Sequence, residues 1–155
     1  MNAKDAISAK LAECFITIGR NRYNFMQAIN VEAKFEKKKS EVPVLGRTGT
    51  GNKSTGWSGS GSCTAHYNSN IIRQMLVDYK NTGKDLYFDM QITNDDPSSD
   101  AGAQTVELYN CNVDGGILAK FDADGEYLEE DFDFTFEDFA IPKTFNLLPG
   151  MYSAR

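Results

Sequence analysis

The sequence predicts a mainly β fold, an antiparallel β-sandwich or partial barrel with one α-helix on its flank. Three segments alternate apolar and polar residues with a period of two, as strands with one buried face do: residues 29–36, 57–67 and 132–137. Residues 71–79 instead place their apolar side chains at helical spacing. Turn residues separate these segments from several shorter apolar runs, so we expect about seven strands and one helix.

Length, charge and cysteine content limit what the chain can do. Its 155 residues are expected to form a single domain, residues 1–155, with room for a real core. The net charge of −6 argues against non-specific binding to DNA or to anionic membranes. We expect no membrane anchor and no secretion signal, because no apolar run is long enough for either. Cys14, Cys63 and Cys111 are widely spaced, which predicts buried structural thiols in a reducing compartment.

The N-terminal part is predicted to hold two strands. Residues 1–11 form an arm or a short helix, and the apolar run 13–18 is a strand that ends in a turn at 19–21. Residues 23–37 then form one long alternating strand, followed by a basic run from Lys37 to Lys39. A nucleic-acid patch is one interpretation of these lysines, but in an acidic chain we favour the solvated start of a loop.

Residues 40–56 are predicted to form a long loop. Residues 46–56 are rich in glycine and hydroxyl side chains, and Pro43 ends regular pairing or marks a sheet edge. The loop joins the long strand to strand 57–67 as a large hairpin with one apolar and one polar face. A loop of this length in a compact domain is either functional or merely mobile, and the composition leaves both alternatives open.

The second half of the chain supplies the helix and the remaining strands. Asn68 or Ser69 can cap the helix at its start, and Gly83 closes it. Residues 140–155 form a C-terminal extension that could pack as an arm. The other expected elements, in chain order, are a strand at 86–93, a loop at 94–104, a strand at 105–113, a turn at 114–116, a returning strand at 117–121, a hairpin turn at 124–125 and the strand at 132–137.

The residues do not assemble a catalytic or metal-binding motif. The segment from Gly46 to Ser54 resembles a phosphate-binding loop, but Asn52 separates the glycine from the lysine and no helix follows. Cys63 and His66 point to opposite faces of a strand, so they cannot form a nucleophile and its base. Asp122 starts a calcium-like run without the later oxygen ligands. We therefore expect no enzyme, no cofactor and no metal site, and a role in binding or assembly remains.

Several stretches together resemble one protein family. They are KSEVPVLGR from Lys39, KSTGWSGSGSCTAHY from Lys53, QMLVDYKNTGKDLYFDMQITNDDPSS from Gln74 and EDFDFTFEDFAIPKTF from Glu130. In combination these stretches resemble the tail tube proteins of contractile phage tails, prophages and phage-tail-like bacteriocins. The resemblance covers residues 7–145 and is weakest in the C-terminal residues.

The resemblance implies the tail tube fold and a structural role. Six subunits would close a ring with their inner strands joined into one barrel, and rings would stack into a hollow tube inside a sheath. Expected partners are further copies of the chain, the sheath, the baseplate and the tape-measure protein, with DNA only as a transient passenger. The expected location is a virion tail or a phage-tail-like particle assembled in the bacterial cytoplasm.

Two groups of residues are expected to serve this role. An acidic, hydroxyl-rich lumen would repel phosphates, and the residues expected to face it are Glu32, Lys34, Glu36, Ser58, Ser60, Ser62 and Thr64. The loop residues expected to contact a neighbouring subunit or ring are Glu41, Leu45, Arg47, Thr48, Thr50, Asn52 and Lys53. The alternative function is a monomeric binding module that recognises sugar or protein through its loops, with Trp57 and Tyr67 as stacking residues.

Overall fold

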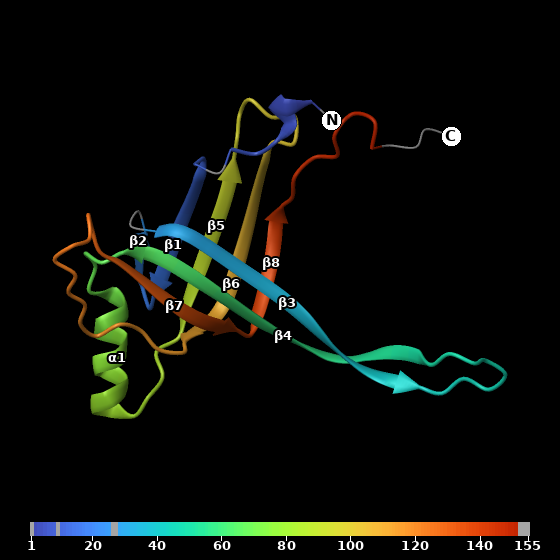
Figure 1. Ribbon diagram of the computed structural model, residues 1–155, viewed down its shortest axis with the longest axis horizontal. Helices are drawn as coiled ribbons and strands as arrows, with labels where there is room; N and C mark the ends of the chain where they lie inside the picture. The colour runs from blue at the N-terminus through green and yellow to red at the C-terminus, as the bar shows by residue number, and fades with distance from the viewer. Residues whose placement is uncertain (1, 9, 26–27, 152–155) are drawn as a thin grey trace.

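The computed structural model describes residues 2–8, 10–25 and 28–151 and contains eight strands, one α-helix and one short 3-10 turn (Figure 1). The elements are the turn Ala3–Asp5, then β1 (Ala12–Ile18), β2 (Asn21–Asn24), β3 (Ala28–Val42), β4 (Gly51–His66), α1 (Ile71–Thr82), β5 (Phe88–Asp95), β6 (Ala103–Val113), β7 (Glu129–Phe136) and β8 (Asp138–Lys143). The described α-helix is neither long nor apolar enough to cross a bilayer.

The strands form two layers that share β6. The order is β2-β1-β5-β6-β7-β4-β3, with β8 also on β6, and every pair is antiparallel. Residues 103–111 of β6 pair with β5 or β8, whereas Asn112 and Val113 pair with β7. A bulge with Asn110 at φ 54° precedes this change of partner, and bulges bend strands. The predicted antiparallel sandwich with a flanking helix is therefore confirmed.

The core lies between the two layers and under α1. Strand β7 shows why the sequence folds this way, because Phe132, Phe134 and Phe136 are buried while Asp133 and Thr135 between them are exposed. The other layer and the helix complete the core with Cys14, Ile16, Phe88, Met90, Leu108, Cys111, Ile72 and Met75. All three cysteines are free and buried, and burial raises the pKa of each thiol to about 12. The prediction of structural thiols is confirmed.

Two glycines of β4 make room for the phenylalanine rings of β7. Gly59 lies opposite Phe136 and Gly61 lies opposite Phe134 in the register. A Cβ atom on Gly61 would overlap the Phe134 ring and approach the backbone oxygen of Glu32 to 2.7 Å. Gly59 and Gly61 are thus required by packing across the strands rather than by flexibility.

The replacement Gly61→Ala should destabilise the protein by about 1–3 kcal/mol, because backbone on one side and a buried ring on the other leave the methyl no space. The matched control is Gly56→Ala on the same strand, where a Cβ meets no atom within 4 Å. That change should be neutral or slightly stabilising. Urea denaturation of both variants tests the prediction, and equal midpoints would contradict it.

The hairpin differs from the prediction in two ways. The expected continuous strand 23–37 is interrupted, because Phe25 leaves β2, donates its backbone N–H to the Cys14 carbonyl at 2.8 Å and packs into the core. The expected loop 40–56 is mostly strand, since β3 runs to Val42 and β4 begins at Gly51. Continuous pairing between the two strands satisfies their backbone groups, so only residues 43–50 remain as a connection.

Three other expectations need correction. Residues 117–121 form no strand and 124–125 no hairpin, because the described segment 114–128 has no ladder partner and leaves Leu118 and Phe121 exposed. The predicted C-terminal extension contains most of β8, which pairs with β6. The helix starts at Ile71 and its N-cap residue is Asn70, so neither Asn68 nor Ser69 occupies the cap position. Ser69 Oγ nevertheless accepts the Ile71 N–H at 3.3 Å. Gly83 ends the helix in the left-handed conformation, as predicted.

Both terminal segments pack at one end of the sandwich (Figure 1). Ser8 donates its backbone N–H to Asp96 Oδ2 at 3.0 Å, and Ser99 Oγ donates to the Asp5 carbonyl at 2.9 Å. From the other terminus, Asn146 donates its N–H to the Ala101 carbonyl at 2.7 Å. The loop between β5 and β6 thus holds the described parts of both predicted arms.

Candidate functional site

One face of the β3–β4–β7 layer is polar along its whole length. The register places Glu32 opposite Ser62, Lys34 opposite Ser60 and Glu36 opposite Ser58. Thr64 lies opposite Asn30, so all seven residues predicted to face a lumen share one surface. They are exposed or half-buried, and the Lys34 ammonium lies 3.5 Å from a Glu32 carboxylate oxygen.

Strand β7 extends this polar face, which the sequence prediction missed. Asp131, Asp133 and Thr135 lie opposite Thr64, Ser62 and Ser60. Thr64 Oγ1 donates to Asp131 Oδ1 at 2.7 Å. The alternation of phenylalanine and acidic residues in β7 carried this information, but the sequence alone did not reveal which strand lies beside β4. A hollow of about 310 Å³ lies on this face between Lys34, Ser60 and Asp133.

The long strand β3 has a free edge. β3 is 15 residues long and pairs with β4 on one side. None of its residues pairs with another described strand on the other side. β2 is the opposite end of the sheet and pairs only with β1 in the described chain. Such an edge offers unpaired N–H and C=O groups to another chain. The edge therefore supports association by strand addition.

The end of the β3–β4 hairpin projects from the body (Figure 1). Pairing between β4 and β7 ends at Gly59, so β4 before this residue contacts only β3 in the ladder. The predicted loop contacts gather on this projection: Glu41 lies opposite Asn52 and Ser40 opposite Lys53, and the remaining four residues, Leu45, Arg47, Thr48 and Thr50, lie in the connection. Leu45 is fully exposed.

An aromatic cluster fixes the base of this projection. Phe35 stacks on Trp57 with ring centroids 4.8 Å apart, and Phe139 of β8 meets both rings edge-on at 5.5 and 5.8 Å. Trp57 thus packs against aromatic neighbours of its own chain, although 37% of its surface stays exposed. The side chain of Tyr67, the other proposed stacking residue, lies under the Arg73 guanidinium at 4.3 Å. Both aromatic side chains that the alternative binding module would use are thus already in contact with neighbours in the chain.

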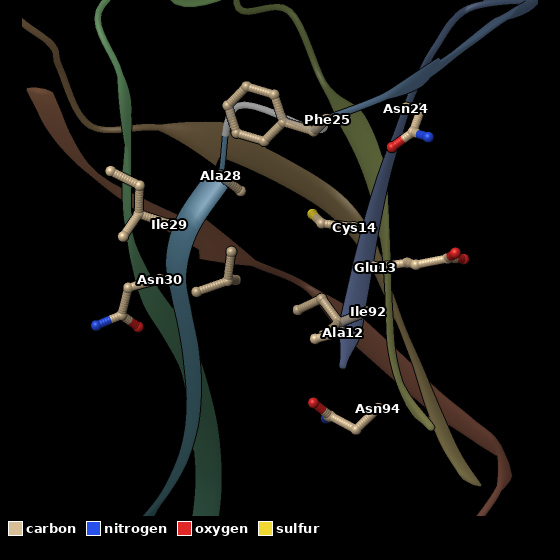
Figure 2. A pocket seen from close by; sticks show the side chains of 11 residues that line it. Ala12, Glu13, Cys14, Asn24, Phe25, Ala28, Ile29, Asn30, Ile92 and Asn94 are labelled. Atoms are coloured by element: carbon tan, nitrogen blue, oxygen red, sulfur yellow. The ribbon is translucent and has the colours of Figure 1, made fainter. Parts of the chain in front are cut away.

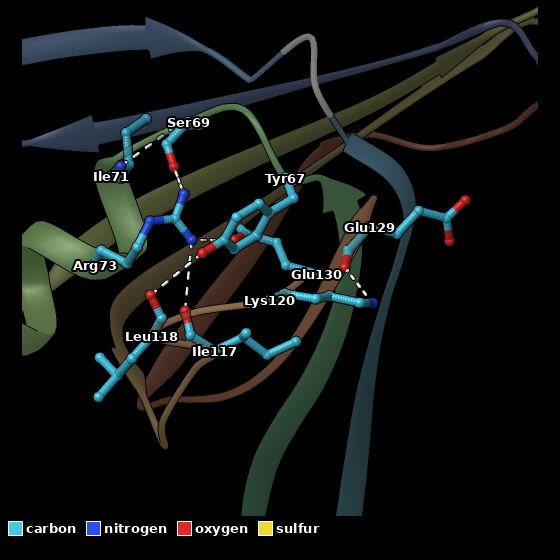
Figure 3. A network of polar contacts seen from close by, with 9 residues as sticks. All are labelled: Tyr67, Ser69, Ile71, Arg73, Ile117, Leu118, Lys120, Glu129 and Glu130. Atoms are coloured by element: carbon cyan, nitrogen blue, oxygen red, sulfur yellow. Dashed lines mark hydrogen bonds and ion pairs between the residues drawn. The ribbon is translucent and has the colours of Figure 1, made fainter. Parts of the chain in front are cut away.

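A polar network joins α1 to the N-terminal end of β7 (Figure 3). Arg73 Nη1 lies 2.5 Å from Glu130 Oε2, and its Nη2 donates to the Ser69 carbonyl. Tyr67 Oη donates to the Leu118 carbonyl at 3.2 Å. Glu130 is buried among core residues, and its carboxylate touches no nucleophile or histidine in the described contacts. The network therefore stabilises the helix position and the 114–128 connection.

A cavity of about 710 Å³ opens between the two layers, with β1 and β5 on one side and β3 on the other (Figure 2). Its titratable lining groups are Glu13, which points away from β3, and Cys14, whose thiol stays protonated because burial raises its pKa to about 12. The remaining lining is Ala12, Asn24, Phe25, Ala28, Ile29, Asn30, Val31, Ile92 and Asn94. This set offers no acid–base pair for chemistry.

The single histidine lies on the polar face, as predicted. His66 is exposed and contacts the Tyr127 ring edge-on, with ring centroids 5.7 Å apart. Cys63 is buried on the opposite face of β4, so the two side chains do not meet. Among the residues that the structure describes, no group of three or more histidine, cysteine or acidic side chains could hold a metal ion. The features that stand out are surfaces suited to assembly.

Comparisons with known proteins agree with this geometry. Residues 1–143 match the family described as phage tail tube protein. The phage-like element PBSX protein XkdM of Bacillus subtilis strain 168 is 38% identical over 143 residues, which are 92% of this chain and 95% of that protein. A chain in the cryo-EM structure of the six-fold symmetrised anti-feeding prophage baseplate superimposes with a TM-score of 0.67 at 11% identity, covering 91% of this chain and 97% of that one. A chain in the sheath-tube complex of an extracellular contractile injection system superimposes with a TM-score of 0.58 at 12% identity, covering 83% of this chain and 86% of that one. The chain therefore belongs to the phage tail tube protein family and is a structural tube subunit.

Proposed function

We propose that six copies of this chain close a ring and that rings stack into the inner tube of a contractile tail. The observation that carries the proposal is the free edge of β3 on a layer with one polar and one apolar face. Joining such layers edge to edge closes a barrel and removes the exposed edges. The six-fold symmetry of the baseplate assembly that contains a similar fold supports the number of subunits.

The polar face lines the lumen in this arrangement. Four carboxylates, Glu32, Glu36, Asp131 and Asp133, share that face with the Lys34 ammonium. An excess of negative charge weakens phosphate binding, so DNA passes without adhering if the particle carries any. A hydroxyl-rich wall keeps the channel wetted. The subunit contributes a conduit or a puncturing tube and catalyses no reaction.

The remaining partners follow from the place of such a tube in a particle. The tube stands inside a sheath and on a baseplate, and it encloses the tape-measure protein during assembly. Relatives in fold come from a sheath-tube complex and from a baseplate, which supports the first two of these partners. The particle is a phage tail or a phage-tail-like bacteriocin, assembled in the bacterial cytoplasm.

Electron microscopy of the purified chain at high concentration and low salt tests the proposal. We expect stacked rings or hollow tubes, with or without a baseplate-derived nucleus. A protein that stays monomeric even with that nucleus would contradict the proposal and return the binding module as the explanation.

Labelling of assembled tubes then tests the lumen. The variant Ser60→Cys should react with a thiol reagent too bulky for the bore when it is unassembled, but not within intact tubes. The native thiols give little background at pH 8, because burial holds their pKa at about 12. Rapid modification of the Ser60→Cys variant in intact tubes would contradict the assignment of the polar face.

A further inference from the structure

The two ends of the β3–β4–β7 layer carry opposite charge. We define the basic arm as residues 37–55, the projecting part of the hairpin. It contains five of the 16 basic residues of the chain and one of its 22 acidic residues, which gives the arm +4 and the rest of the chain −10. Neither of the two ion pairs found in the described residues involves the arm. Its charges are therefore free to meet a partner.

The arm also exposes apolar side chains at its tip. Leu45 is fully exposed, and Val42 and Val44 are each 39% exposed. A two-stranded ribbon of this kind is marginally stable in water without further contacts. Its partner should thus combine negative charge with apolar surface.

Such a surface lies at the opposite end of the same layer. We define the acidic loop as residues 121–127, which precede β7. Asp122, Asp124 and Glu126 are exposed there, and Phe121 and Tyr127 are 90% and 65% exposed. The loop contains no basic residue.

The register fixes the relative positions of the arm and the loop. Glu129, just after the loop, lies opposite His66, whereas Phe136 at the other end of β7 lies opposite Gly59, near the base of the arm. Figure 1 shows the arm and the 114–128 connection at opposite ends of the molecule. The arm of one copy therefore cannot reach its own acidic loop, but a copy stacked along the layer presents one.

We infer that the basic arm of one copy docks on the acidic loop of a second copy. The inference rests on the proposed function and specifies its contact between rings. Like charges disfavour a contact between two arms or between two loops, so each contact joins an arm to a loop and is heterologous. All copies in a stack therefore point in the same direction. A repeated head-to-tail contact of this kind gives an open-ended stack with distinct ends.

Charge reversal tests the contact. The arm variant carries Lys38→Glu and Lys53→Glu, and the loop variant carries Asp124→Lys and Glu126→Lys. Each alone should raise the critical concentration for tube formation about tenfold or more, because two favourable pairs per contact become repulsive. An equimolar mixture of the two variants, or both changes in one chain, should restore assembly to within about threefold of the wild type.

Controls separate this inference from the proposed function. The variant Asp95→Lys with Asp100→Lys makes the same charge change as the loop variant, on exposed residues near the termini, and should assemble like the wild type. Tubes from the arm and loop variants at the wild-type concentration, or no rescue by mixing folded variants, would overturn the arm–loop contact alone. A wild-type chain that forms no tubes under any of these conditions would overturn the proposed function itself.

Discussion

Replacing residues 39–55 with an Asn-Gly turn should yield a folded protomer that forms no tubes. Lys38 lies opposite Gly56, and a two-residue turn of this type closes an antiparallel pair at that spacing. The excision leaves the core and the aromatic cluster of Phe35, Trp57 and Phe139 intact. It removes every residue of the basic arm except Lys37 and Lys38, and it leaves the acidic loop in place.

The measurement compares assembly with folding in the same sample. Circular dichroism and urea denaturation should give a free energy of unfolding within about 1 kcal/mol of the wild type, since the arm adds no buried apolar surface. Sedimentation and electron microscopy should detect only small species, at most isolated rings. Tubes of ordinary length from the excised chain would show that stacking does not depend on the arm.

The second large effect concerns the buried ion pair, where Arg73→Met should lower the free energy of unfolding by about 3–5 kcal/mol. Glu130 is 2% exposed and its Oε2 depends on Arg73 Nη1 at 2.5 Å. Its other oxygen, Oε1, has no hydrogen-bond partner in the described structure. Removal of the guanidinium leaves a buried carboxylate without compensation, and the cation over the Tyr67 ring is lost as well.

A double-mutant cycle separates the pair from general damage. Adding Glu130→Leu to Arg73→Met should recover much of the loss, because two apolar side chains replace two buried charges. The matched control is Lys80→Met on the exposed face of the same helix, which should change stability by less than about 0.5 kcal/mol. A loss of under about 1 kcal/mol for Arg73→Met would mean that water or a shift of Glu130 compensates for the missing partner.

The sequence predicted the polar face correctly because alternation is a local signal. Glu32 and Ser62 belong to two strands, and the alternation of each strand can be recognised from its own residues alone. A hairpin then brings the two strands side by side. The contribution of Asp131 required the knowledge that β7 lies beside β4, which no local pattern supplies.

The projecting hairpin was misread because glycine and hydroxyl residues are typical of loops but also occur in strands. Residues 51–56 look like a linker in the sequence, yet they belong to β4 and pair with β3 along its last residues. Strand β8 was missed for a related reason, since its partner β6 is distant in sequence and Pro142 argues locally against a strand. The Arg73–Glu130 pair joins residues 57 positions apart and left no pattern at all.

The aromatic cluster at the base of the hairpin has an optical consequence. Trp57 is the only tryptophan of the chain, and it stands 37% exposed, stacked on Phe35, where the projection leaves the body. Intrinsic fluorescence excited at the indole band therefore reports on this one position without an added dye. Any event that covers or reorients the hairpin changes the polarity around that indole, so the emission wavelength can follow polymerisation in real time and in the native sequence.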